Sequence, residues 1–297
     1  MSFADTSWSM HWAAWAAIAL GALLAALLTL NVYGNYRWSA ATQGLLQGLK
    51  EGRSKLPRAP YNAQEILTLP APVQRYFRAV LKDGQPIVSG VKVLHTGSFN
   101  VTAFSEREVW FPFTSEQHVV TRKPGFVWSA RMALLPGISI RVHDAYVGGV
   151  GTLRPAVWGL FSLTNQHGSG EIARGELMRY MMEATWYPTA LLPGQGTRWV
   201  AVDDASADAT MQDGDIRMTM RYTFDADGLV TTITVAARGA LIDAKVVMLP
   251  WEGRMSNYQW RNGMRVPLTG EAAWLTPRGR KPYWRGTIES MVYRFSG

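Results

Sequence analysis

The segment IRMTMRYTFDADGLVTTITVAA, residues 216–237, decides the fold class of this chain. Its first part places apolar side chains at every second position: Ile216, Met218, Met220, Tyr222 and Phe224. That period of two is typical of a strand with one buried face. Asp227-Gly228 follows and suits a tight turn, because glycine accepts a positive φ. Residues 229–237 continue as a second strand, so the segment predicts an antiparallel hairpin.

The same alternation recurs in residues 126–134 and 138–143. Asp213-Gly214 and Asn262-Gly263 mark further hairpin turns. Residues 85–297 therefore predict an antiparallel meander of about ten to thirteen strands, interrupted by one helix.

That helix is predicted over residues 170–185, GEIARGELMRYMMEAT, and it ends before Pro188, which cannot continue it. A shorter helix is predicted over residues 71–81, with Pro72 in its first turn. The expected fold is α+β and mostly β. It consists of a large curved antiparallel sheet, a half-barrel-like meander, with a few covering helices.

Residues 12–30, WAAWAAIALGALLAALLTL, carry no charge and would span about 28 Å as a helix, which is enough to cross a membrane. Two alternatives are a cleaved signal peptide, with small residues at Ser39-Ala40-Ala41, and a buried core helix. A signal peptide has a shorter apolar region and a basic start, whereas residues 1–11 carry only Asp5. The sequence therefore favours an anchor. Aromatic residues flank this span as at membrane interfaces: Trp8, Trp12, Trp15, Tyr33, Tyr36 and Trp38.

The chain is expected to divide into a tail (1–11), a transmembrane helix (12–30), a helix and linker (31–60) and a β domain (61–297). Within residues 31–60, an amphipathic helix is predicted over 38–53 and a proline-containing linker over 55–60. Arg37 and Lys50 follow the span and no Lys or Arg precedes it. This distribution predicts a single-pass cell-membrane protein and favours the cytoplasmic side for the β domain.

The composition of this 297-residue chain excludes several classes of protein and of chemical site. With 47% apolar and 18% charged residues it is not a disordered chain. The absence of cysteine excludes disulfides, thiolate nucleophiles and cysteine-ligated metal centres. Of the net charge of +8, the β domain (61–297) carries +5, from 25 Lys or Arg and 20 Asp or Glu. Its basic residues are scattered singly along the strands except for the cluster Arg278, Arg280 and Lys281, so we expect no nucleic-acid partner. An anionic lipid surface is a simpler partner for a tethered basic domain.

Glu176, Arg179 and Glu183 form one charged stripe on the predicted helix 170–185. This stripe is either a salt-bridge ladder in solvent or a buried arginine held between carboxylates, which would form a binding or acid–base site. Trp186 comes directly after the helix and favours a buried helix end.

Asp144 and Tyr146 precede the glycine-rich run 148–151. A phosphate-binding loop would lead into a helix, but strand-like residues follow, so the run predicts a hairpin. The five histidines show no metal-binding spacing. We therefore predict no metal and no cofactor.

The many Trp and Met residues of the β domain indicate either a large sheet core or an apolar ligand cavity. The leading hypothesis is that a lipid or other apolar ligand binds between the sheet and helix 170–185. Its proposed ligand-binding residues are Trp128, Asp144, Tyr146, Glu176, Arg179, Glu183 and Trp186. No catalytic motif is identified. The alternatives are an enzyme that uses Arg179 and Glu183 with Asp144 or Tyr146, and a non-catalytic envelope scaffold.

The segments PGFVWSARM (124–132), DAYVGGVG (144–151) and RYMMEATWYPTALLP (179–193) resemble a bacterial family known only as a domain of unknown function. That resemblance implies no activity and no residue roles. In outline, the expected architecture is similar to LolA-type and mycobacterial lipoprotein carriers, which hold acyl chains in a half-barrel. The likeness implies lipid binding and a periplasmic location, the latter against the charge rule.

Overall fold

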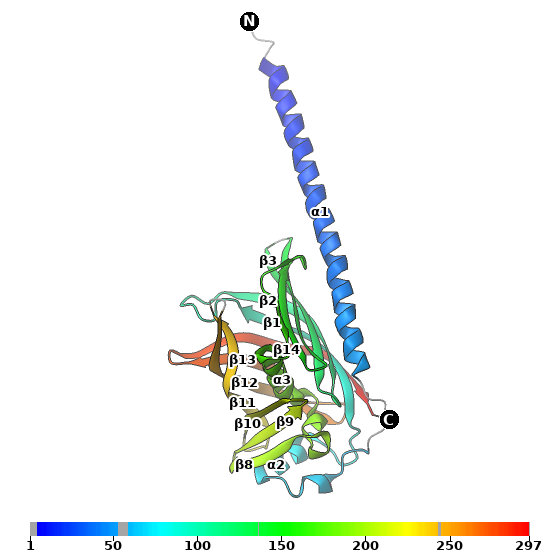
Figure 1. The fold of residues 1–297 in the computed structure, drawn as a ribbon, viewed down its shortest axis with the longest axis vertical. Helices are drawn as coiled ribbons and strands as arrows, with labels where there is room; N and C mark the ends of the chain where they lie inside the picture. The colour runs from blue at the N-terminus through cyan, green and yellow to red at the C-terminus, as the bar shows by residue number, and fades with distance from the viewer. Residues whose placement is uncertain (1–4, 53–58, 136, 243–244, 297) are drawn as a thin grey trace.

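The computed structural model describes residues 5–52, 59–135, 137–242 and 245–296. Fourteen strands form one antiparallel sheet whose order is β6-β5-β4-β3-β2-β1-β14-β13-β12-β11-β10-β9-β8, with β7 paired to β5 (Figure 1). Neighbours in the sheet are neighbours in the chain, except where β7 pairs with β5 and where the first strand β1 pairs with the last strand β14. The predicted mostly-β antiparallel meander is confirmed.

The helices are α1 (Asp5–Glu51), α2 (Ala71–Val80) and α3 (Glu171–Glu183), with 3-10 turns η1 (Ala63–Ile66), η2 (Ala184–Trp186), η3 (Pro188–Leu191) and η4 (Pro193–Gln195). The strands before α3 are β1 (Val88–Asn100), β2 (Trp110–Val120), β3 (Gly125–Leu135), β4 (Ile138–Val147), β5 (Val150–Val157), β6 (Phe161–Ser162) and β7 (Gln166–Gly168). Those after it are β8 (Arg198–Asp203), β9 (Ser206–Asp213), β10 (Ile216–Phe224), β11 (Val230–Ile242), β12 (Lys245–Arg261), β13 (Met264–Thr276) and β14 (Gly279–Phe295).

The sheet curves around α3. This helix contacts β4 and β5 near one end of the strand order, and β10 and β11 near the other, which is possible only if the sheet bends (Figure 1). Two glycines permit the close approach. A Cβ on Gly151 of β5 would lie 2.6 Å from the backbone nitrogen of Ala173, and one on Gly253 of β12 would lie 2.1 Å from Sδ of Met182. At these two strands, β5 and β12, the inner face of the sheet is therefore packed directly against α3.

The hairpin turns lie where the aspartate–glycine and asparagine–glycine pairs predict them. Gly214, Gly228 and Gly263 all have positive φ, as does Asn262. The glycine-rich run is also a turn, between β4 and β5, with φ of 60° at Gly148 and 83° at Gly149. The hairpin prediction for residues 148–151 is confirmed.

Helix α1 is continuous, so the helix predicted over 38–53 is present through Glu51 and is joined to the apolar span without a break. The second half of α1 packs on the outer face of β2, β3 and β4. Trp38 is 3% exposed and its ring is stacked on His143 at 3.8 Å, so it is a packing residue, whereas the sequence had suggested an interfacial aromatic. Leu49 is also buried, near Val127 and Ala145. Most of the predicted linker, residues 53–58, lies outside the described residues.

The first half of α1 projects away from the sheet (Figure 1). By length and composition this helix could cross a membrane, and none of its most apolar window is buried in the fold. Trp12, Trp15 and Leu28 are more than half exposed. These exposures exclude the buried core helix that the sequence left open.

Candidate functional site

A buried ionic cluster lies where α3 faces β3 and β4. The guanidinium of Arg179 donates from Nη1 to Oδ2 of Asp144 at 2.5 Å and from Nε to Oε1 of Glu183 at 2.7 Å. The same guanidinium lies over the rings of Phe126 and Trp128, at 4.9 and 4.8 Å from their centroids. Tertiary structure thus selects the buried alternative for the charged stripe, because the sheet wraps both faces of α3.

Gln117 of β2 completes the cluster and is absent from the sequence prediction. Its Nε2 donates to Oε2 of Glu183 at 2.5 Å, and its Oε1 accepts from Nη2 of Arg179 at 3.3 Å. In the register of β2 and β3, Gln117 pairs with Trp128 and so faces inward. An amide at an inward position of a buried strand is the sequence signal that could have identified it.

Glu176 lies one helical turn before Arg179 and is 3% exposed. Its Oε2 and Oδ1 of Asp144 meet no donor among the described side chains, yet the two carboxyl groups are within hydrogen-bonding reach of each other. A proton on Glu176, donated to Asp144, satisfies both oxygens. Burial, and then the charge of Asp144, raise the pKa of Glu176 well above its ordinary value, so the protonated form is favoured.

Arg238 of β11 balances the charge of this cluster. It is 8% exposed, it lies over the ring of Trp251 at 4.6 Å, and it interacts electrostatically with Glu176. With Glu176 neutral, the two carboxylates of Asp144 and Glu183 match the two guanidinium groups of Arg179 and Arg238. Burying a balanced set costs far less than burying an unpaired charge.

Burial also shifts the other titratable groups of the cluster. It raises the pKa of Glu183, while the donors Arg179 and Gln117 oppose that shift. Desolvation, and then the charge of Arg179, lower the pKa of His95 to about 3, so this imidazole is neutral at pH 7. The arrangement therefore places a carboxyl group with a raised pKa, Glu176, among two carboxylates and two guanidinium groups.

The cluster includes four of the predicted site residues: Asp144, Glu176, Arg179 and Glu183. Trp128 lies against it through the Arg179 contact. Tyr146 and Trp186 are buried but do not join it. The hydroxyl of Tyr146 donates to Asp213 at 2.7 Å, and Trp186 lies against His95 with ring centroids 5.0 Å apart. Of the residues named for an enzyme, Arg179, Glu183 and Asp144 are therefore neighbours, and Tyr146 lies outside their group.

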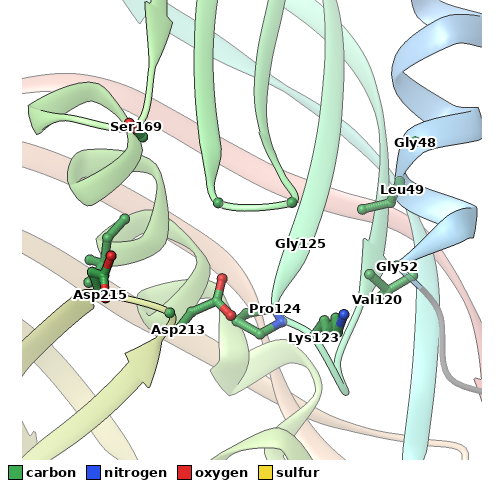
Figure 2. Close-up of a pocket in the computed structure, with 14 residues that line it drawn as sticks. Gly48, Leu49, Gly52, Val120, Lys123, Pro124, Gly125, Ser169, Asp213 and Asp215 are labelled. Atoms are coloured by element: carbon green, nitrogen blue, oxygen red, sulfur yellow. The ribbon is translucent and has the colours of Figure 1, made fainter.

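A separate pocket of about 550 Å³ opens at the end of α1, away from the ionic cluster. Figure 2 shows Asp213 and Asp215 on one side of it, and Leu49, Val120 and Lys123 on the other. The glycine turn between β4 and β5 also lines it. Among the described residues, no group of three or more His, Asp or Glu side chains could hold a metal ion.

Residues 67–293, from the end of η1 to the last strand, match the sequence profile described as "Family of unknown function (DUF6920)". The chain belongs to the DUF6920 family. The match covers α2, the sheet and α3, so the whole ionic cluster lies in the DUF6920 domain and α1 lies outside it. A search of curated proteins found no match.

Solved structures similar to this DUF6920 protein include a LolA superfamily protein from Nitrosomonas europaea. The two are 11% identical with a TM-score of 0.38, over 79% of this chain and 94% of that one. A beta-barrel-like DUF1849 protein from Brucella abortus is 7% identical with a TM-score of 0.23, over 70% of this chain and 99% of that one.

Proposed function

We propose that this DUF6920 protein is anchored in the cell membrane by α1 and binds a lipid or other amphiphile on the inner face of its curved sheet. The observation that carries the proposal is a row of inward-facing apolar side chains. This row runs from the buried ionic cluster to the end of the sheet nearest the apolar half of α1.

The packing of α1 supports an anchor over a cleaved signal peptide. Cleavage near Ser39-Ala40-Ala41 would remove Trp38, which covers His143, and would cut the helix one residue before Thr42, whose hydroxyl lies 2.7 Å from Nε2 of His143. It would also remove Gly34, where a Cβ would lie 2.2 Å from the carbonyl oxygen of Trp158. A segment that fits the domain this closely is expected to stay with it.

We place the domain on the cytoplasmic side, because Arg37 and Lys50 follow the apolar span and no basic residue precedes it. Protease digestion of spheroplasts tests this placement. The domain should resist digestion until the membrane is opened, and cleavage in intact spheroplasts would place it outside.

The apolar row follows from strand register. Trp128 pairs with Asp144, and both side chains contact Arg179, so the inward face of β3 and β4 is fixed there. With a period of two, the inward pairs that follow toward the hairpin tip are Ala130 with Val142 and Met132 with Ile140. All four are apolar. Met132 lies about 13 Å beyond Trp128 along the strand, which is a length suited to part of an acyl chain.

Unpaired ring nitrogens offer a binding place for the polar end of such a ligand. Nε1 of Trp128 and of Trp186 and Nε2 of His95 are buried and have no hydrogen-bond partner among the described residues. They belong to one series of ring contacts: Trp186 with His95, His95 with Trp284, Trp284 with Phe113, and Phe113 with Trp128. The two indole N–H groups can donate to ester or carboxylate oxygens. A lipid supplies both the oxygens and the chain.

Photo-crosslinking in the membrane tests the proposal. The full chain is reconstituted with phospholipid that carries a diazirine in its acyl chain, irradiated and mapped by peptide mass spectrometry. We expect adducts on inward residues of β3 and β4 in addition to adducts on residues 12–30, which serve as an internal standard. Adducts confined to α1 and the sheet's outer surface would contradict binding inside the sheet.

Two neighbouring substitutions on β3 provide the matched comparison. Met132→Glu places a charge on the inner face, whereas Ala133→Glu places the same charge on the exposed outer face. Met132 is buried, so a carboxylate there loses its solvation to the fold as well as to any acyl chain beside it. Met132→Glu should reduce the inner adducts by about tenfold or more, with its melting temperature measured beside that of Ala133→Glu to show that the sheet still folds. Ala133→Glu should leave the inner adducts unchanged. Equal adduct yields in the two variants would count against the proposal.

A further inference from the structure

The geometry points to a second membrane contact. We propose that the described residues at the tip of the β3–β4 hairpin, Leu135 and Gly137, and the β5–β6 loop rest in the head-group layer of the bilayer that α1 would cross, preferring anionic lipid. This inference rests on the proposed anchoring by α1 and does not depend on a ligand inside the sheet. It assigns a lipid-binding surface to residues that neither the ionic cluster nor the pocket uses.

The first step is that α1 is held against the sheet through several polar and packing contacts. Besides the Trp38 stack and the Thr42 contact with His143, Arg141 of β4 donates to the side-chain oxygen of Asn35. Together these contacts span about two turns of α1, from Asn35 to Thr42. The domain therefore has a fixed orientation relative to the helix and to the membrane that the helix would cross.

The second step is the height of the hairpin tip along α1. Arg141 lies level with Asn35, and β4 begins three residues closer to the tip, at Ile138. Three strand residues cover about 10 Å, which corresponds to about six or seven residues of helix. The tip therefore reaches the last turn of the apolar span, which ends at Leu30. Figure 1 shows the β3 end of the sheet extending alongside α1 in this way.

The third step is the chemistry of this end of the sheet. Leu135 at the hairpin tip is 65% exposed, and Phe161 of β6 is 57% exposed. Phe161 pairs with Val157, which pairs with Ile140, so Phe161 lies close to the level of the tip. Trp158 joins the two loops by donating from Nε1 to the carbonyl oxygen of Gly137 at 2.9 Å. Large exposed apolar groups beside a membrane-crossing helix are suited to the head-group boundary.

The fourth step is charge. Arg37 and Arg131 are exposed just below this apolar end, and Arg154 lies half-buried beside Trp38. The segments 31–50, 129–135, 137–143 and 150–163 on this side of the molecule contain no Asp or Glu, and the outward Glu116 of the adjoining β2 is paired with Lys92 and His118. Arginines beneath an apolar tip, with the nearby carboxylate already paired, match a surface of anionic head groups.

Single-cysteine labelling tests the inference directly, because the chain has no native cysteine. Leu135→Cys carries an environment-sensitive fluorophore in the full chain, reconstituted in nanodiscs with phosphatidylglycerol. We expect a blue-shifted emission and quenching by lipids that carry a nitroxide near the head group. Leu67→Cys is the matched control, an exposed leucine at the far end of the domain, and its label should not be quenched. An unquenched label at Leu135 would overturn the inference.

Two further variants separate this inference from the proposed anchoring. A label at Leu24→Cys, in the apolar span, reports the anchor itself and is read with lipids that carry the nitroxide in the acyl chain, because residue 24 lies about 9 Å inside the end of the span at Leu30. Quenching at residue 24 without quenching at 135 refutes the second contact and leaves the anchor intact, whereas no quenching at either refutes both. Replacing Arg131 by Glu in the Leu135→Cys chain should reduce the quenching at residue 135 in anionic nanodiscs and have little effect in zwitterionic ones. An equal effect in both would contradict the preference for anionic lipid.

Discussion

At the scale of single residues, the protonation of Glu176 controls the charge balance of the interior. The pKa of Glu176 is raised because its carboxyl group is buried, and then because the charge of Asp144 lies beside it. Sequence spacing placed Glu176, Arg179 and Glu183 on one helix face. It could offer Asp144 only as one candidate partner beside Tyr146, and it missed Gln117, since both partners come from strands more than thirty residues away in the chain.

The pH dependence of stability should reveal this proton. A glutamate in the unfolded chain titrates near about 4.3. Above that pH the unfolded chain loses the proton while folded Glu176 keeps it, so stability falls by up to about 1.4 kcal/mol per pH unit until the pKa of folded Glu176 is reached. Glu176→Gln removes this loss, because the amide donates to Asp144 and does not titrate. The melting temperature of Glu176→Gln minus that of the unmodified chain should therefore increase from pH 5 to pH 8.

Glu106→Gln, on the exposed β1–β2 loop, is the control and should follow the pH dependence of the unmodified chain. Melting in detergent at several pH values measures all three proteins. If Glu176→Gln instead becomes less stable than the unmodified chain as the pH rises to 8, Glu176 is ionised and paired in the fold.

At the scale of elements, the strands and hairpin turns follow from local sequence, because side-chain alternation and glycine turns act within a few residues. The surroundings of α3 do not follow from local sequence. Its charged stripe is buried because β4 and β5 cover one side and β10 and β11 cover the other. The close contact between α3 and the sheet depends on glycines in the strands. The sequence does not show why these positions need glycine, because the reason is the helix that packs on them.

Gly151→Ala tests that contact. The added Cβ would meet the backbone of Ala173 at 2.6 Å, and backbone cannot move aside as a flexible side chain can. We expect a loss of about 1–3 kcal/mol, measured as a lower melting temperature. Gly44→Ala is the matched change in open space on α1 and should be neutral or stabilising by up to about 1 kcal/mol. Equal melting temperatures for the Gly151→Ala variant and the unmodified chain would show that α3 is not held this closely.

At the scale of the whole molecule, α1 connects the apolar span to the sheet without a flexible joint, and Trp38 is central to that connection. Trp38→Ala removes the stack on His143 and should weaken docking of the helix by about 3 kcal/mol or more. Hydrogen exchange should then accelerate in residues 31–50 and on the outer face of β3 and β4, and the strands around α3 should keep their protection.

Tyr36→Ala serves as the comparison, since Tyr36 is 73% exposed two residues earlier on the same helix. It should leave exchange in residues 31–50 unchanged. If the two variants exchange alike, the helix does not depend on Trp38 for its attachment.

The sequence by itself determined the apolar span, the antiparallel meander, its turns and the charged stripe of α3, because each is set by residues close together in the chain. Only tertiary structure decided that the stripe is buried, that Tyr146 bonds to Asp213, and that Trp38 packs on the sheet. Those outcomes depend on contacts between distant segments. Whether a polar or aromatic side chain meets water, a partner or a membrane is settled by what the folded chain places beside it.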